Sequence, residues 1–322
     1  MHDYKAVANA PLQTSLPASE IPGLPGKPAF RLKGPFPSAV PVVIAVPHAG
    51  RAYAPDLLSA MRNPGLTCHR LEDRLIDTIA SDLAARSGAT IIVADAPRAM
   101  IDLNRDPADV DWEMIAGASW ESGGRPAPHG ARASGGLGLV PRRLGGVGEI
   151  WKRRLNATDL KTRIDGVHTP YHRALDHLLR QVRRRWGVAL LLDFHSMPPL
   201  TESGGRGADI VLGDRFGASC GGAFVASGFD YLSQVGLKAA YNRPYAGGYV
   251  LNRHGRPSEN IHAMQIEVCR SLYLDSRLFD LGKRAEKVVE DLSGLVAHLV
   301  DSVTNLRRSS LKKDAIWRQA AE

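Results

Sequence analysis

An apolar run that ends in polar side chains constrains this chain more than any other feature of its sequence. Residues 188–192 read Val-Ala-Leu-Leu-Leu, and Asp193, His195 and Ser196 follow directly. A run of this length is typical of a strand that is buried on both faces of a sheet. Because ligands bind at the carboxyl edge of open α/β sheets, we expect these polar side chains to lie in a functional site.

A second segment repeats this design nearer the N-terminus. Residues 41–46 read Pro-Val-Val-Ile-Ala-Val, and His48 follows after one proline. Two buried strands that each deliver a histidine at the same end indicate one shared site. Catalytic zinc sites typically use three protein ligands, often His and carboxylate, and leave one position for water. His48 and His195 are therefore candidate zinc ligands, and the alternative for each is a structural histidine.

The expected third ligand is a carboxylate, and the helix predicted after the first strand offers two. Apolar residues between 71 and 83 recur at helical spacing, with Glu72 and Asp73 in the first turn. Either side chain could reach the histidines, but acids at a helix start are also favoured by the helix dipole alone. The residues by themselves leave open which acid binds, and whether either does.

The order of the predicted elements indicates an α/β fold. A strand at 40–46, the helix at 71–83 and a strand at 89–94 form a βαβ unit, which implies a parallel pair with a right-handed crossover. Further strands are predicted at 208–214 and 264–269, and further helices at 150–164, 171–186, 223–235 and 281–299. We therefore predict a mixed, mostly parallel sheet flanked by helices.

This pattern occupies residues 37–301, which we predict to be a single α/β domain. Residues 1–36 are rich in Pro, Ala and Gly without a helical or strand period, and are predicted to be an extended or disordered arm. Residues 302–322 are predicted to be a basic C-terminal tail. The Gly- and Pro-containing stretch from Pro107 to about Gly148 predicts a long insertion, which we expect to close over the site.

Asn104 and Arg105 lie in a loop beyond the strand at 89–94. The planar guanidinium of Arg binds a carboxylate through two parallel hydrogen bonds, so this pair suits a substrate carboxylate. A salt bridge to Asp102 or Asp106 is an equally good explanation of Arg105.

Two acids lie within the apolar strands. Glu267 is costly to bury without a purpose, and a Glu in a partly dry site has a raised pKa, which suits a group that takes up and returns a proton. The alternative is a partner for Arg270. Asp193 is expected on the same side of its strand as His195, where it could orient the imidazole. A strand-end acid that faces solvent is the alternative there.

Composition limits the other classes of function. The chain has 322 residues and a net charge of +8, which permits a basic polyanion-binding protein, although a solvated helix face and the tail account for much of that charge. Polar residues gathered at strand ends favour an enzyme with a small anionic substrate, without a specific nucleic-acid partner. Three cysteines without CxxC spacing, no signal sequence and no membrane-spanning apolar run lead us to expect a cytoplasmic protein.

Four motifs give the chain a resemblance to a known family. Residues 47–50 (Pro-His-Ala-Gly), 101–105 (Ile-Asp-Leu-Asn-Arg), 193–198 (Asp-Phe-His-Ser-Met-Pro) and 265–270 (Gln-Ile-Glu-Val-Cys-Arg) resemble the N-formylglutamate amidohydrolase family. The resemblance runs from about residue 40 to about residue 300. More distantly, the chain is similar to zinc carboxypeptidases and aspartoacylases, which implies their mixed α/β sheet.

The resemblance also implies roles for individual residues. His48 and His195 would bind zinc, Glu267 would be the general base, and Asn104 with Arg105 would hold the substrate carboxylate. The carboxypeptidase pattern places its acidic ligand three residues after the first His, where this chain has Arg51. Asp73 resembles the Asp that opens the equivalent helix in the amidohydrolase family and is therefore the expected third ligand, with Glu72 as the alternative.

The activity implied by the resemblance is zinc-dependent hydrolysis of N-formyl-L-glutamate to formate and glutamate, a step of histidine degradation, with one zinc ion per chain. Two alternatives remain. One is a deacylase for other N-acyl amino acids or a carboxypeptidase-like hydrolase, because pocket walls rather than the fold set specificity. The other is the non-enzymatic polyanion-binding protein.

Overall fold

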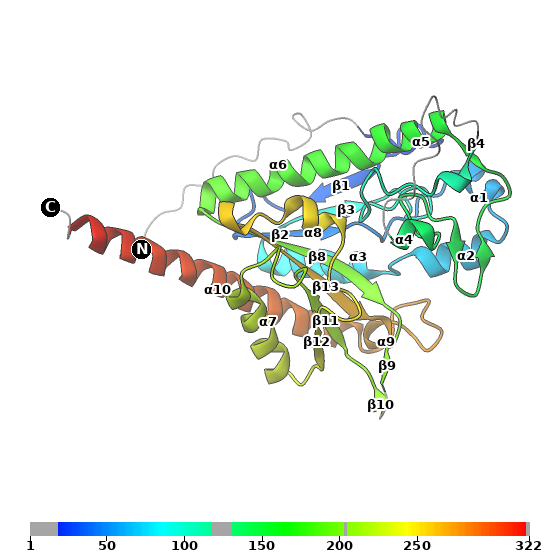
Figure 1. The fold of residues 1–322 in the computed structure, drawn as a ribbon. Helices are drawn as coiled ribbons and strands as arrows, with labels where there is room; N and C mark the ends of the chain where they lie inside the picture. The colour runs from blue at the N-terminus through cyan, green and yellow to red at the C-terminus, as the bar shows by residue number, and fades with distance from the viewer. Residues whose placement is uncertain (1–18, 117–130, 203–204, 320–322) are drawn as a thin grey trace.

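A computed structural model describes residues 19–116, 131–202 and 205–319 of the chain. Its centre is a seven-stranded sheet in the order β1-β3-β2-β8-β13-β11-β12 (Figure 1). The strands are β1 (Phe30–Lys33), β2 (Val42–Val46), β3 (Thr90–Ala94), β8 (Ala189–Met197), β11 (Ile210–Gly213), β12 (Ala239–Tyr241) and β13 (Ile261–Cys269). β1 and β13 run antiparallel to their neighbours β3 and β11, and the other neighbouring pairs are parallel. The predicted mixed, mostly parallel α/β sheet is confirmed.

Helices cover both faces of this sheet. One face packs against α3 (Ile76–Ser87), α7 (Gly222–Gln234) and α10 (Ala285–Gln319), and the other against α6 (Thr169–Trp186) (Figure 1). Alternate strand residues enter the two cores, so that Leu190 and Leu192 pack on the α3 side and Leu191 on the α6 side. All nine residues of β8 are buried, as expected for a central strand of a parallel sheet.

Shorter elements connect these layers. They are α1 (Pro55–Ala60), α2 (Pro64–Leu71), η2 (Trp112–Met114), β4 (Ile115–Ala116), α4 (Ala131–Ser134), β5 (Arg143–Leu144), β6 (Gly148–Glu149), β7 (Leu155–Asn156), α5 (Ala157–Arg163), η3 (Ile164–His168), β9 (Thr201–Glu202), β10 (Gly205–Arg206), α8 (Tyr249–His254), η4 (Pro257–Glu259) and α9 (Arg270–Tyr273). Across the described ranges, no helix is long and apolar enough to cross a membrane.

The helix predicted at 71–83 differs from the observed one at its start. α2 ends at Leu71, and α3 begins only at Ile76 because Leu75 has a left-handed backbone with φ 57°. Glu72 and Asp73 therefore lie in the break between two helices instead of in a first helical turn. Apolar spacing alone could not show this break, since the residues on both sides keep the helical period.

The predicted helix at 150–164 also starts late. Residues 150–156 contain β7 instead of a helix, and α5 begins after Asn156, whose side chain accepts a hydrogen bond from the Asp159 backbone N–H. Asn is a favoured helix-capping residue, so this boundary was present in the sequence and missed.

Both ends of the predicted domain extend further than 37 and 301. β1 lies inside the predicted arm and pairs with β3, and at four residues it is too short to show a strand period. The helix predicted at 281–299 runs on as α10 to Gln319, through the predicted tail. Residues 1–18 of the arm lie outside the described part of the chain.

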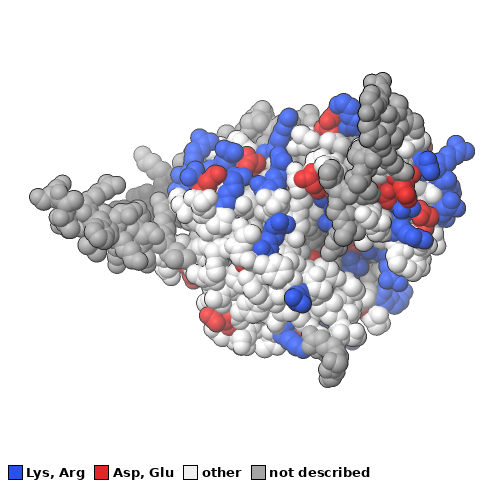
Figure 2. Space-filling view, viewed as in Figure 1, with Lys and Arg blue, Asp and Glu red and all other residues white. Residues whose placement is uncertain are grey.

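Basic side chains are scattered over the face seen in Figure 2, with acidic side chains among them.

Candidate active site

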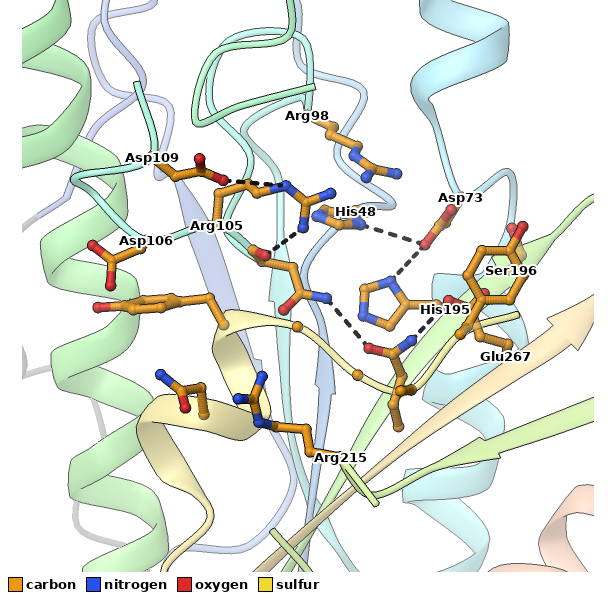
Figure 3. Close-up of a pocket in the computed structure, with 18 of the residues that line it drawn as sticks. His48, Asp73, Arg98, Arg105, Asp106, Asp109, His195, Ser196, Arg215 and Glu267 are labelled. Atoms are coloured by element: carbon orange, nitrogen blue, oxygen red, sulfur yellow. Dashed lines mark hydrogen bonds and ion pairs between the residues drawn. The ribbon is translucent and has the colours of Figure 1, made fainter. Parts of the chain in front are cut away.

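Three of the predicted site residues meet at the edge of the sheet. His48 follows β2, His195 lies in β8, and Asp73 comes from the break between α2 and α3 (Figure 3). Oδ2 of Asp73 lies 3.0 Å from Nδ1 of His195 and 3.7 Å from Nδ1 of His48. All three residues are buried, and their potential ligand atoms lie within 4.8 Å of one another.

Two further carboxylates hold the imidazole rings from behind. Nε2 of His48 is 2.7 Å from Oδ1 of Asp102, and Nε2 of His195 is 3.0 Å from Oδ2 of Asp193. Each ring therefore presents Nδ1 to Asp73. Metal-binding histidines are usually held in this way, with the second ring nitrogen bonded to a carboxylate. Asp193 has the orienting position that the alternation of its strand predicts.

The donor atoms suit a divalent cation such as zinc. Nδ1 of His48 is buried and has no hydrogen-bond partner among the described residues, although it faces the Asp73 carboxylate. A buried nitrogen without a partner is costly unless something binds it. Two imidazole nitrogens and one carboxylate oxygen are a common ligand set of catalytic zinc.

The charges of the cluster explain its pKa values. Burial by itself would raise the pKa of Asp73, but the hydrogen bond with His195 and the nearby His48 imidazole outweigh it and hold the pKa well below its ordinary value. Burial would lower the pKa of His195, but the Asp193 carboxylate raises it well above its ordinary value. A metal ion bound at Nδ1 of His195 would have to displace any proton held there.

Glu72 lies outside the cluster. Its carboxylate accepts a hydrogen bond from the Tyr53 hydroxyl at 2.9 Å and pairs with Arg74 at 3.0 Å. Arg270 braces the break between the helices, because it donates to the Glu72 carbonyl oxygen at 2.5 Å and lies 3.4 Å from Asp73. The alternative partner proposed for Glu267 is thus engaged with other groups.

Glu267 lies on β13 directly beside His195 on β8. Its Oε1 accepts a hydrogen bond from the Gln265 side chain at 2.9 Å, and the Gln265 oxygen accepts one from the Asn104 amide at 3.3 Å. Burial raises the pKa of Glu267, His195 lowers it and Asp73 raises it, with a net value of about 7. A carboxyl group with this pKa exchanges a proton readily near neutral pH.

These residues line a cavity of about 490 Å³. Asn104 and Arg105 lie on its wall, in the loop after β3. The side-chain carbonyl oxygen of Asn104 accepts a hydrogen bond from the Val250 backbone N–H at 2.9 Å. Nε of Arg105 donates to the Leu137 carbonyl at 2.9 Å and lies 3.9 Å from Asp109. Leu137 and Asp109 belong to the insertion, whose described part therefore borders the cavity; residues 117–130 lie outside the described ranges.

The loop that carries Asn104 and Arg105 is held by two kinds of group. Asp102 pairs with Arg98 at 2.9 Å and accepts from the Asn104 backbone N–H at 2.8 Å. Burial would raise the pKa of Asp102, but Arg98, His48 and Arg105 hold it well below its ordinary value. From the sequence, Asp102 is expected only as a salt-bridge partner of Arg105, whereas its contacts join the loop to His48.

Three buried histidines hold the same loop from its other side. Nε2 of His172 is 2.9 Å from the Leu103 carbonyl oxygen, and Nε2 of His168 is 2.9 Å from that of Arg105. Nδ1 of His172 lies 3.0 Å from Nε2 of His254. Burial lowers the pKa of all three imidazoles, that of His254 to about 3. Neutral rings can form this chain if His254 donates to His172 and His172 donates to the carbonyl.

Fold and site together define an α/β protein with a buried, metal-compatible His–Asp–His cluster at the carboxyl edge of its sheet. Comparison with known sequences identifies the family. The chain belongs to the N-formylglutamate amidohydrolase family, whose profile matches residues 40–274. The N-formylglutamate deformylase of Pseudomonas aeruginosa is 26% identical over 265 residues, which cover 79% of this chain and 91% of that protein. The Pseudomonas putida N-formylglutamate deformylase is 27% identical over 243 residues, which cover 73% of this chain and 82% of that protein.

Solved structures agree with this assignment. The crystal structure of N-formylglutamate amidohydrolase from Ralstonia eutropha JMP134 superposes with a TM-score of 0.76 at 28% identity, over 87% of this chain and 99% of that one. A protein of Agrobacterium tumefaciens, 15% identical with a TM-score of 0.62 over 87% of this chain and 96% of that one, shares the fold.

Proposed function

We propose that this protein hydrolyses the formyl amide bond of N-formyl-L-glutamate, releasing formate and glutamate, with a divalent cation held by His48, Asp73 and His195. One observation carries the proposal: the three candidate ligands, the buried Glu267 and the Asn104–Arg105 loop line one cavity. Membership of the N-formylglutamate amidohydrolase family and the named deformylase relatives support the substrate. Zinc is the expected cation because the donor set is two imidazoles and a carboxylate.

The cation would supply electrostatic activation, polarising the formyl carbonyl and lowering the pKa of a water molecule beside it. Glu267 then acts as the base and as the acid. With a pKa of about 7 it accepts the proton of the attacking water and returns it to the amide nitrogen as the C–N bond breaks. The second proton of the water also passes to the amine, so formate and the ammonium form of glutamate leave and Glu267 regains its ionised starting form.

Asn104 and Arg105 hold the substrate so that the formyl group reaches the cluster. The Arg105 guanidinium is anchored to the Leu137 and Asn104 carbonyl oxygens, each at 2.9 Å, which fixes its position before the substrate arrives. A prepositioned guanidinium binds a carboxylate with little further ordering. The hydrogen bond from Val250 holds the Asn104 amide in the same way.

The test measures metal content and formate release on the wild type and on Glu267→Gln. We expect one zinc ion per chain in both proteins, with formate release lowered by about 10²- to 10⁴-fold in the variant, the usual size of a general acid–base contribution. Glu72→Gln is the matched control, since that carboxylate points toward Tyr53 and Arg74. Bound metal without formate release from N-formylglutamate would overturn the substrate, and full activity of Glu267→Gln would overturn the mechanism.

A further inference from the structure

Several arginines line the cavity, and the proposed reaction gives a role to only one of them, Arg105. Arg98 pairs with Asp102, Arg270 with Asp73, and Arg105 contacts Asp109 and two carbonyl oxygens. Arg215 also lines the cavity, and its guanidinium has no hydrogen bond or ion pair to any described residue. Figure 3 shows it entering the cavity from the side opposite Arg105.

The backbone around Arg215 is built to direct this side chain. Arg215 has a left-handed backbone with φ 55°, which is uncommon for a residue with a side chain and concentrates at functional sites. Its backbone N–H donates to the Ala246 carbonyl at 2.7 Å. The Arg215 side chain also packs beside Gly247, where a Cβ would lie 3.4 Å from its Cγ atom.

The acid next to Arg215 is not its partner. Oδ1 of Asp214 accepts from the Asn242 side chain at 2.8 Å, and Oδ2 accepts from the Tyr241 hydroxyl at 3.0 Å. Asp214 is buried, whereas Arg215 is only partly buried in the cavity. A strained, half-buried cation without a protein partner among the described residues is suited to an anionic ligand.

The position of Arg215 decides which anionic group it can reach. Arg105 donates to the Asn104 carbonyl oxygen, the Asn104 backbone N–H donates to Asp102, and Asp102 bonds directly to His48. Arg105 is therefore near the proposed cation. Arg215 follows β11, which lies two strand positions from β8, or roughly 10 Å at the usual spacing of strands. The two arginines thus suit two anionic groups at different distances from the reacting bond.

We propose that Arg215 binds the side-chain carboxylate of the substrate and sets the preference for an acidic N-formyl amino acid, while Arg105 binds the α-carboxylate. This assignment rests on the proposed deformylase function. N-formylglutamate carries both carboxylates, and the α-carboxylate is the nearer one to the formyl amide. Arg215 is thus a specificity-determining residue that touches the substrate and takes no part in the proton transfers.

One other arginine on the cavity lining competes for this role. Arg70 lies in α2, is exposed, and also has no side-chain partner among the described residues. Water and salt screen the charge of an exposed side chain more strongly than that of a half-buried one, so the exposed side chain attracts an anion less. We therefore expect Arg70 to contribute only to the overall positive potential of the cavity. Arg70→Gln is the matched control.

The test compares kcat/KM for N-formyl-L-glutamate and for N-formyl-L-glutamine, which has the same shape without the side-chain charge. Arg215→Gln is expected to lose about 10- to 100-fold on the glutamate substrate, mainly through KM, and less than about threefold on the glutamine substrate. Arg215→Lys should recover part of the loss, since it keeps the charge without the planar fork. Retained glutamine activity shows that the variant is folded.

Three outcomes separate the ideas. Equal losses on both substrates would overturn the assignment, because they place Arg215 on a group that the two substrates share. A loss confined to the glutamate substrate in Arg70→Gln, with Arg215→Gln unchanged, would assign the role to Arg70 instead. A wild-type protein that releases formate from neither substrate would overturn the proposed function, and the assignment of Arg215 with it.

Discussion

Two groups of buried histidines lie on either side of the loop at residues 102–105, and they have opposite electrostatics. His195 is flanked by two carboxylates, and its pKa is raised well above the ordinary value. His172 contacts a carbonyl oxygen and another imidazole, and its pKa is lowered well below that value. Burial lowers the pKa in both cases, so the carboxylates make the difference.

The comparison shows that a buried imidazole nitrogen without a partner is not enough to indicate a metal ligand. Nδ1 of His254 is as unsatisfied as Nδ1 of His48. Only His48 faces a carboxylate, and the cluster with Asp73 and His195 is the only candidate metal site among the described residues. Carboxylates in direct contact would attract a cation to the first group. Among the described residues the second group has no carboxylate within hydrogen-bond distance, so its rings are neutral and can hold backbone carbonyls.

Asp73→Asn tests the difference most severely, because it removes the carboxylate that both ligand histidines share. We expect metal affinity to fall by more than about 100-fold, beyond the loss typical of removing an outer carboxylate, and formate release to fall with it. Metal content after dialysis and formate release measure the two effects. A variant that keeps its metal would show that the cluster is structural, like the histidines on the other side.

Asp193→Asn should have a smaller effect, since Asp193 contacts the histidine and is not a proposed ligand. The amide can still accept a hydrogen bond from Nε2 of His195 but carries no charge. We expect metal affinity to fall by about 10- to 100-fold, with the Michaelis constant for N-formylglutamate changed little. Metal titration against a chelator gives the affinity, and an unchanged value would remove the orienting role of Asp193.

The pH dependence of stability reports on the other group. The folded pKa of His254 is about 3, below the ordinary 6.5, so the folded state excludes a proton that the unfolded state binds. Its contribution is complete above pH 6.5 and is lost as pH falls, by up to about 1.4 kcal/mol per pH unit. His254→Gln keeps a donor for His172 and should flatten the slope of the free energy of unfolding between pH 6.5 and 5. Urea titrations of both proteins measure it, and equal slopes would contradict the neutral chain.

The strand-end histidines were predictable because apolar runs fix where β2 and β8 lie, and the parallel sheet brings their ends together. The choice between Glu72 and Asp73 was not predictable from spacing. It depends on the left-handed backbone at Leu75, which separates α2 from α3 and turns the two carboxylates in different directions.

Other residues of the site differ in how far the sequence could predict them. Gln265 could have been found, since it lies two residues before Glu267 and a strand places such residues on one face. The contacts of Asp102 could not, because they depend on how the loop after β3 folds back over His48. The role of His172 could not be predicted either, because it requires the distant partner His254.

The short strand β1 has a consequence for how the molecule behaves at high concentration. β3 is buried and apolar along its whole length, and without β1 it would offer unpaired N–H and C=O groups to another chain. β1 occupies that side of β3 and presents Arg31 and Lys33 near the new border, with Arg31 paired to Asp95 at 2.7 Å. Charged side chains on an outer strand oppose edge-to-edge pairing. The segment that precedes the histidine-bearing strands thus protects this edge of the sheet against self-association and aggregation.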